Sequence, residues 1–273
     1  MPHSSPNLAS KWRWQESWLT FGLSNRFIFV VVLRKKRRLR SRRLASLSAS
    51  LRLFGDQHQQ IAFMPHTRTI SRIDFVAGTL IATAMLCLFS LLSHGSSLLV
   101  TFVPGIVATW GLFTWLYTTQ AKLPTFDKAA PIFMLTLANQ FPHFAEEFMT
   151  GFRVKFPMLY GGIEYTESLF VLFNMISYAA FLAFFVIAYH FERFFLLVPP
   201  LFFIVYGALG NAISHTWWSL SSGAYFPGLY TAQFYWLLGP LALYQISSSK
   251  AVVVVLISTL AGVLVPLLWL FSK

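Results

Sequence analysis

A histidine and two glutamates stand close together in the stretch Asn139-Gln140-Phe141-Pro142-His143-Phe144-Ala145-Glu146-Glu147. Residues three and four positions apart share one face of an α-helix, so His143, Glu146 and Glu147 are expected to point the same way. The stretch closes an apolar run, and a charge at mid-bilayer costs roughly 2.5–3.5 kcal/mol. Three ionisable groups on such a face predict a partner that offsets this cost, either a metal ion or a buried acid–base network.

A second group of polar residues follows later in the chain. Asn211 and His215 are four positions apart and share a helix face, and Tyr225 precedes a turn that contains Pro227 and Gly228. A catalytic or metal-binding role is one interpretation of this group. The alternative is structural, because Asn and His side chains also join membrane helices through hydrogen bonds, and Tyr is typical of membrane interfaces.

The composition is that of an integral membrane protein. The chain has 273 residues, of which 56% are hydrophobic and 11% are charged, whereas soluble domains carry about 25% charged residues. The only cysteine, Cys87, lies in an apolar run and cannot form an intramolecular disulfide. It is expected to be buried as a small hydrophobic residue.

Hydropathy predicts an all-α polytopic helix bundle with seven transmembrane segments, or six as the alternative. The third segment contains Pro131 and Pro142, which predict a kink. Trp217 and Trp218 are expected in the aromatic belt at the membrane surface. The seven segments are 75–93, 98–118, 130–150, 169–189, 194–220, 229–246 and 251–271.

The alternating direction of successive spans predicts which polar groups can meet. If the first five segments all cross the membrane, the third and fifth run in the same direction, and the fourth starts where they end. The shared side would then gather the two motif stretches, the start of the fourth segment and the turn after the fifth. The residues concerned are His143, Glu146, Glu147, Asn174, Asn211, His215 and Tyr225.

The net charge of +12 belongs entirely to the N-terminal part. Residues 1–72 hold fourteen Lys and Arg against two acidic residues, whereas residues 73–273 hold seven of each. We therefore divide the chain into a basic tail, 1–72, and a transmembrane domain, 73–273. The tail is interpreted as a disordered segment on anionic lipid, as a transit peptide, or as an artefact of a true start at Met64. An isolated basic run is weak evidence for nucleic-acid binding, and no such partner is expected.

The two motif stretches together resemble the HXXEE-domain family of multi-spanning membrane proteins. His143-Phe-Ala-Glu146-Glu147 is similar to the motif that names the family. Asn211-Ala-Ile-Ser-His215 and the Tyr225-Phe-Pro-Gly-Leu-Tyr-Thr231 turn are similar to its second block. The resemblance covers roughly residues 132–232. It implies a shared site but no reaction, because the family has no established activity.

The residue types favour a metal-dependent membrane enzyme of hydrolase type. The predicted ligands are His143, Glu146 and His215, because two imidazoles and a carboxylate suit Zn, Fe or Mn. Glu147 is predicted to be the general base or a fourth ligand, with Glu146 as the second catalytic carboxylate. Because the two glutamates are adjacent, one of them can be a ligand while the other supports a ligand. A metal-activated water would be the nucleophile or the acid–base group.

The expected partners are the lipid bilayer and a lipid or other hydrophobic substrate, which Asn211, Tyr225 and Asn174 would orient. Two alternatives remain: a cofactor-free lipid isomerase that shuttles protons through His and Glu, and a transporter or structural membrane protein. CAAX-type intramembrane proteases also use a Glu pair, but they place an Arg where this chain has Gly151. The predicted location is the cell membrane, or an organelle membrane if the tail is a transit peptide.

Overall fold

Residues 68–272 are those that the computed structural model describes, and within this range the chain forms helices and no β-strand. The predictions for the basic tail up to residue 67, including the alternative start at Met64, lie outside the described residues. The elements are α2 (Arg72–Leu92), α3 (Ser97–Thr118), α4 (Phe126–Ala138), α5 (Gln140–Thr150), α6 (Phe152–Leu159), α7 (Glu167–His190), η1 (Phe194–Leu197), α8 (Val198–Phe202), η2 (Phe203–Gly210), α9 (Asn211–Ser222), α10 (Leu229–Ala232), α11 (Tyr235–Ser247) and α12 (Lys250–Phe271).

Five of the described helices are long and apolar enough to cross a membrane, which agrees with an all-helical membrane protein. They are α2, α3, α7, α12 and the continuous run from η1 to α9 (Phe194–Ser222). The run from η1 to α9 is mostly buried, whereas α2, α7 and α12 keep most of their surface exposed. The bundle is therefore built around the Phe194–Ser222 helix.

The other two predicted segments are each broken into two shorter helices. The third is divided at Asn139 into α4 and α5, and the sixth is divided near Phe234 into α10 and α11. The break at Asn139 has a local cause, because Pro142 has no N–H with which to bond the carbonyl of Ala138 four residues earlier. The expected kink in the third segment thus takes the form of a helix end followed by a new helix.

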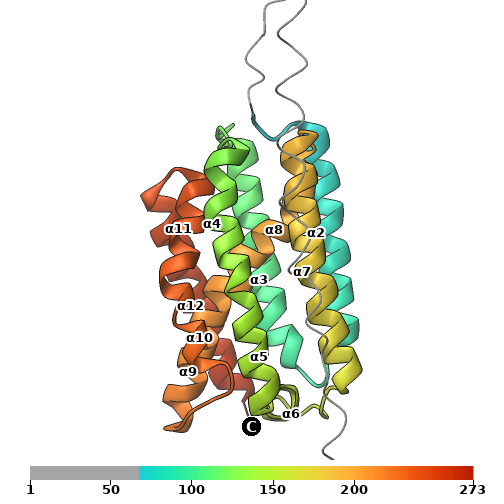
Figure 1. The fold of residues 1–273 in the computed structure, drawn as a ribbon, viewed down its shortest axis with the longest axis vertical. Coiled ribbons are helices and arrows are strands. Elements are labelled where there is room, and N and C mark those ends of the chain that lie inside the picture. Colours follow the sequence, from blue (N-terminus) through green and yellow to red (C-terminus); the bar gives the residue numbers. More distant parts are fainter. Residues whose placement is uncertain (1–67, 273) are drawn as a thin grey trace, which may run out of the picture. The chain divides into compact units, whose positions relative to one another are not determined.

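The packing brings the two motif stretches to the same end of the bundle. Helix α4 packs against α11, α5 packs against α10, and α10 packs against α9. Figure 1 shows α5, α9 and α10 together near the lower end, with α4 and α11 above them. The residues of α5 and α9 can therefore reach one another although more than fifty positions separate them in the sequence.

The described bundle includes residues just before the domain boundary expected at residue 73. Ile70 is fully buried, and the Arg68 carbonyl accepts a hydrogen bond from the Leu123 N–H at 2.7 Å. Ser71 and Asp74 form a capping box at the start of α2, which satisfies N–H groups that the first helical turn leaves without partners.

Two expectations about burial are wrong. Cys87 is exposed, because α2 packs through a narrow stripe that contains Gly78, Ala82 and Phe89. Trp218 is 2% exposed and therefore does not lie in a surface belt. Its indole N–H donates to the Tyr160 hydroxyl at 2.7 Å in the interior.

Candidate metal centre

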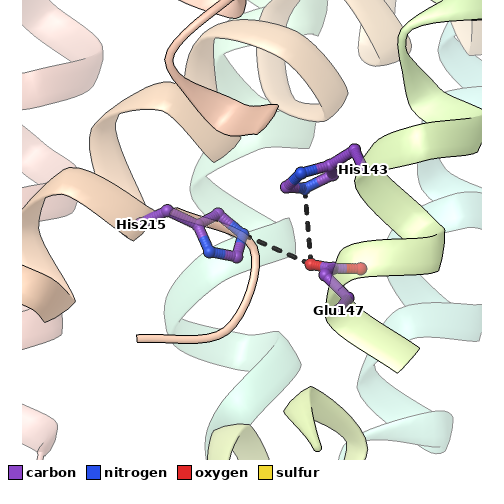
Figure 2. Close-up of side chains that lie close together, drawn as sticks. All are labelled: His143, Glu147 and His215. Carbon is purple, nitrogen blue, oxygen red and sulfur yellow. Dashed lines mark ion pairs between the residues drawn. The ribbon is translucent and has the colours of Figure 1, made fainter. Parts of the chain in front are cut away.

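The side chains of His143, Glu147 and His215 converge inside the bundle (Figure 2). Glu147 Oε1 lies 3.4 Å from His143 Nε2 and 3.3 Å from His215 Nε2. One nitrogen or oxygen from each of the three residues lies within 4.8 Å of the other two. Both histidines are 0% exposed and Glu147 is 5% exposed. This buried group could hold a metal ion.

Two helices position these three side chains. His143 and Glu147 are four residues apart in α5 and therefore lie one above the other on the same face. Helix α5 ends shortly afterwards at Gly151, whose φ of +84° is a left-handed conformation that glycine adopts without strain. His215 comes from α9, which continues directly from the π-helical stretch η2. Such π-helical stretches occur frequently at functional sites.

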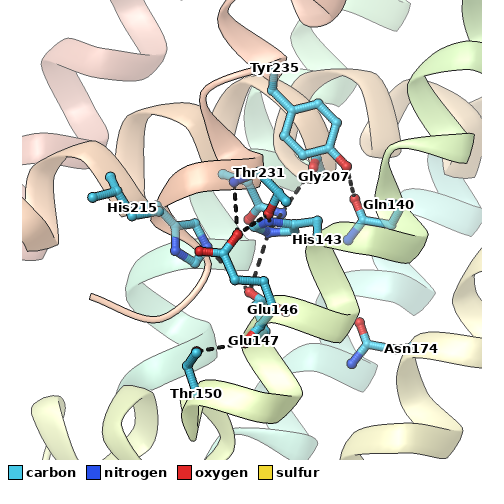
Figure 3. A network of polar contacts seen from close by, with 12 residues as sticks. Gln140, His143, Glu146, Glu147, Thr150, Asn174, Gly207, His215, Thr231 and Tyr235 are labelled. Atoms are coloured by element: carbon cyan, nitrogen blue, oxygen red, sulfur yellow. Dashed lines mark hydrogen bonds and ion pairs between the residues drawn. The ribbon is translucent and has the colours of Figure 1, made fainter. Parts of the chain in front are cut away.

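Hydrogen bonds fix the tautomer of His143. Thr231 Oγ1 donates to Glu146 Oε2, since a carboxylate oxygen can only accept. The same Thr231 Oγ1 lies 2.9 Å from His143 Nδ1 and must accept from it, because its own proton is already used. His143 is thus protonated on Nδ1, and Figure 3 shows Thr231 beside both His143 and Glu146. The other ring nitrogen, Nε2, lies 3.4 Å from Glu147 Oε1.

Asn211 independently supports this tautomer. Its Nδ2 donates to the carbonyl of Gly207 at 3.0 Å, which identifies this atom as the amide nitrogen. The second proton of Nδ2 points to His143 Nε2 at 3.1 Å, and only an unprotonated Nε2 can accept it. The predicted contact between the two motif stretches is therefore a direct hydrogen bond from Asn211 to His143.

His215 lies in an aromatic pocket and lacks hydrogen-bond partners with good geometry. Its ring meets Trp218 edge-on at 5.0 Å and Phe152 at 5.3 Å between ring centroids. Neither ring nitrogen makes a hydrogen bond within the described residues, although Nε2 is 3.3 Å from Glu147. The Pro227 carbonyl is close enough to interact with the ring. A buried polar atom without a partner costs about 1–3 kcal/mol, so a ligand at this position would remove a real penalty.

The donor atoms fit a divalent cation. An unprotonated His143 Nε2 has one lone pair, which the Asn211 N–H occupies; a cation beside Glu147 Oε1 would take that lone pair in place of the Asn211 N–H. Tetrahedral zinc ligands at about 2.0–2.1 Å from the ion lie roughly 3.3–3.4 Å from one another. The two distances from Glu147 Oε1, 3.4 Å and 3.3 Å, agree with this spacing. Three protein ligands leave at least one position for water or substrate.

Glu146 anchors the turn before α10 and has no free position for a metal. Its carboxylate accepts from the Tyr225 hydroxyl at 2.7 Å, from the Tyr230 N–H at 3.0 Å and from the Thr231 N–H at 2.8 Å. The Thr231 hydroxyl adds a fourth bond. Burial raises the pKa of Tyr225, and the neighbouring carboxylate raises it further, so the phenol stays protonated and donates. Glu146 is an acceptor at both oxygens, as an ionised carboxylate is.

Gly228 closes the site from the side of His215. A Cβ at this position would lie 2.5 Å from His215 Cε1, 2.8 Å from His215 Nδ1 and 3.0 Å from Glu147 Cγ. The φ of Gly228 is +88°, in the left-handed region that favours glycine. Contact and conformation both require a residue without a side chain here, which explains why glycine follows Pro227 in the turn.

Asn174 is connected to the centre only through other side chains. Tyr235 packs edge-on against His143 with ring centroids 5.6 Å apart, and its hydroxyl donates to Gln140. Gln140 Nε2 points to the Tyr178 hydroxyl at 3.0 Å, and Tyr178 donates to Asn174 Oδ1 at 2.8 Å. Figure 3 shows Asn174 apart from the two histidines.

The structure exchanges the two carboxylates relative to the sequence prediction. Glu147, which was expected as the base or a fourth ligand, lies between His143 and His215. Glu146, which was expected as a ligand, faces α10 and the turn before it, where Tyr225, Tyr230 and Thr231 together supply four donors. Asn211 contacts His143 directly, whereas the Tyr225 hydroxyl lies beside Glu146 and Thr150 and its ring stacks on Tyr230.

Sequence reasoning assigned no role to several residues that shape the site, namely Gln140, Gly228, Thr231 and Tyr235. Gln140 lies inside the first motif stretch, and Gly228 and Thr231 lie inside the second. Their place within these stretches was the signal that could have identified them. Tyr235 follows the second stretch, and nothing in its sequence context distinguishes it from other tyrosines near a span.

Replacing Thr231 with Val should weaken metal binding roughly 10–100-fold, the usual effect of losing the group that orients a histidine ligand. The variant removes the hydroxyl between His143 Nδ1 and Glu146 Oε2 with little change of volume. Titration of the purified protein with Zn²⁺ measures the change. Thr150→Val is the matched control, because the Thr150 hydroxyl donates to the Glu146 backbone carbonyl and makes no contact with His143. Equal affinities for the two variants would contradict the tautomer assignment.

Comparison with known proteins found no match to this chain among family models, curated proteins or solved structures.

Proposed function

We propose that this protein is a metal-dependent membrane enzyme of hydrolase type that acts on a lipid or another hydrophobic substrate. The ligands would be His143, Glu147 and His215. The supporting observation is the buried meeting of two imidazoles and one carboxylate, with an unprotonated Nε2 facing a carboxylate oxygen. Two histidines and one glutamate form the ligand set of several zinc hydrolases, and the same set with open positions suits Fe(II) or Mn(II).

Each nearby residue would have a distinct part in this function. A divalent cation here would lower the pKa of a bound water and polarise a carbonyl group of the substrate. Both close contacts of Glu147 use Oε1, which leaves Oε2 as the oxygen that would take up a proton. Glu146 would hold the His143 ring in place through Thr231. A cation on Nε2 would displace the Asn211 N–H, which would then be free to orient the substrate. Tyr225 would keep Glu146 in position rather than orient the substrate.

The same proposal includes seven membrane crossings and membership of the HXXEE-domain family. The pairs α4–α5 and α10–α11 would form the two crossings beyond the five long helices. Broken helices are tolerated at membrane depth where protein surrounds them, and these two pairs pack against each other. The contact of His143 with Asn211 supports a common site for the two motif stretches. The cell membrane is the proposed location, or an organelle membrane if the basic tail, 1–72, acts as a transit peptide.

Metal analysis of the purified protein tests this function. Wild type, prepared without chelators, should contain about one Zn, Fe or Mn ion per chain, as expected for one three-ligand site. The His143→Ala/His215→Ala double variant should contain none. His190→Ala is the control, because His190 is exposed at the end of α7.

Two outcomes would contradict the proposal. A metal-free protein that retains lipid-converting activity would instead favour the cofactor-free isomerase, with His and Glu as proton shuttles. A metal-free protein that converts no lipid in membranes would favour a transport or structural role.

A further inference from the structure

A cavity of about 500 Å³ adjoins the candidate metal centre. Its walls are mostly apolar and come largely from α2, α3, α6, α7, α8 and η2, with Phe89, Phe102 and Phe173 among the lining residues. Glu147 is the only acidic or basic residue among the described residues that line it. The cavity thus joins a long hydrocarbon-like space to one of the three proposed ligands.

The cavity opens toward the membrane between α2 and α7. Leu88 of α2 lines it and is 48% exposed, and Leu172 and Ile176 of α7 line it and are 57% and 64% exposed. Helix α2 packs against α3, α8 and η1, and α7 packs against α4, α8 and η1, whereas contact between α2 and α7 is sparse. Both helices are apolar enough to cross a membrane, so the opening faces lipid chains.

Three polar side chains that line the cavity belong to the candidate metal centre and its surroundings. Glu147, Gln140 and Asn211 line the cavity, and each belongs to the network around His143 (Figure 3). Gln140 joins that network through Tyr235. A molecule that filled the cavity from the membrane would therefore place its apolar part between α2 and α7 and a polar group beside Glu147.

The size of the cavity suits one hydrocarbon chain. A methylene group fills nearly as much space as a water molecule, roughly 30 Å³ in the liquid. The volume of about 500 Å³ is more than ten times the space of one such group, so the cavity has room for a long hydrocarbon chain. A bound chain would displace water from the apolar walls of the cavity. This loss of contact between water and apolar surface favours binding.

We propose that the cavity binds one long hydrocarbon chain of a membrane lipid, which enters sideways between α2 and α7 and presents the carbonyl at its polar end to the Glu147 corner. This inference names a substrate-binding site for the proposed enzyme. Only one part of it rests on the proposed function, namely that the bound lipid is the substrate. The binding of the chain itself depends on the cavity and its opening.

A photoreactive lipid tests the inference. The probe is an ester of a 16-carbon fatty acid that carries a diazirine near the methyl end, added to the full-length protein in membranes. Labelling should concentrate on cavity-lining residues of α2, α3 and α7. Leu88→Trp and Ile176→Trp, which narrow the opening, should reduce labelling roughly tenfold, the change expected when about two methylene groups lose their contacts.

The controls lie on the same two helices. Leu80 of α2 and Leu182 of α7 are 66% and 39% exposed but do not line the cavity, so Leu80→Trp and Leu182→Trp should label like wild type. Metal content is measured on every sample. Labelling spread evenly over all lipid-facing helices, or equal labelling of the opening variants and the controls, would overturn the inference while leaving the metal proposal intact.

The double variant His143→Ala/His215→Ala separates the two proposals. It should lose metal and keep the probe, because neither histidine lines the cavity. Strong labelling of a wild-type protein without metal would sink the proposed function and preserve the lipid site.

Discussion

Replacing Glu147 with Gln should remove the metal from the purified protein, whereas replacing the adjacent Glu146 with Gln should leave it bound with lower affinity. Glu147 Oε1 is 3.3–3.4 Å from both histidines, and an amide is a far weaker ligand for a divalent cation than a carboxylate. Glu146 touches neither metal-facing nitrogen and acts through Thr231. We expect an affinity loss of more than ~100-fold for Glu147→Gln and of roughly 10–100-fold for Glu146→Gln.

The measurement is a Zn²⁺ titration of both variants beside wild type, with thermal unfolding to show that each remains folded. The pair is its own control, because both variants replace a glutamate of α5 with the same isosteric residue. If Glu146→Gln lost the metal and Glu147→Gln retained it, the assignment from the sequence would be correct and the one from the structure wrong. Metal affinity should also fall as the pH is lowered, since protons compete for imidazole and carboxylate ligands.

The second large effect is expected from Gly228→Ala, which should abolish metal binding, while Gly223→Ala should not affect it. Both glycines are left-handed, with φ of +88° and +63°, so each alanine carries a similar strain of about 1–2 kcal/mol. Only at Gly228 does the added Cβ meet His215 and Glu147, at 2.5–3.0 Å. Gly223 has nothing within 4 Å of the same position.

Thermal unfolding of the two variants reports the backbone strain, and their metal content reports whether the site is displaced. Gly223→Ala should unfold earlier but contain as much metal as wild type. Gly228→Ala should show the same strain, a further loss of about 1–3 kcal/mol from overlap with a buried ring, and no metal. Equal metal contents would show that the turn can move away from His215 without consequence for the site.

The alternating direction of the predicted spans was enough to predict the meeting of His143, Asn211 and His215, but not the roles of the two adjacent glutamates. Glu146 and Glu147 follow His143 by three and four positions, and both spacings place a side chain on the same broad face of a helix. The choice between them is made by α10, whose N–H groups at Tyr230 and Thr231 require an acceptor. That requirement is tertiary and cannot be obtained from the periodicity of α5.

Burial was less predictable than the helices themselves. A membrane helix is apolar on the side that faces lipid and on the side that faces protein, because lipid chains are as apolar as leucine. Hydropathy therefore located α2 and α9 but did not indicate that Cys87 faces outward or that Trp218 packs against His215. The broken third segment was foreseeable from Pro142, since proline removes a specific backbone bond.

The position of Gly228 over His215 has a kinetic consequence. Both histidines are fully buried, so an ion held between them would leave on this side through movement of the segment that carries Gly228, which the donors to Glu146 hold in place. The other route crosses an apolar cavity, which opposes the passage of an ion. The rate at which a chelator strips the protein should therefore be set by the opening of the turn and be independent of chelator concentration once the chelator is in excess.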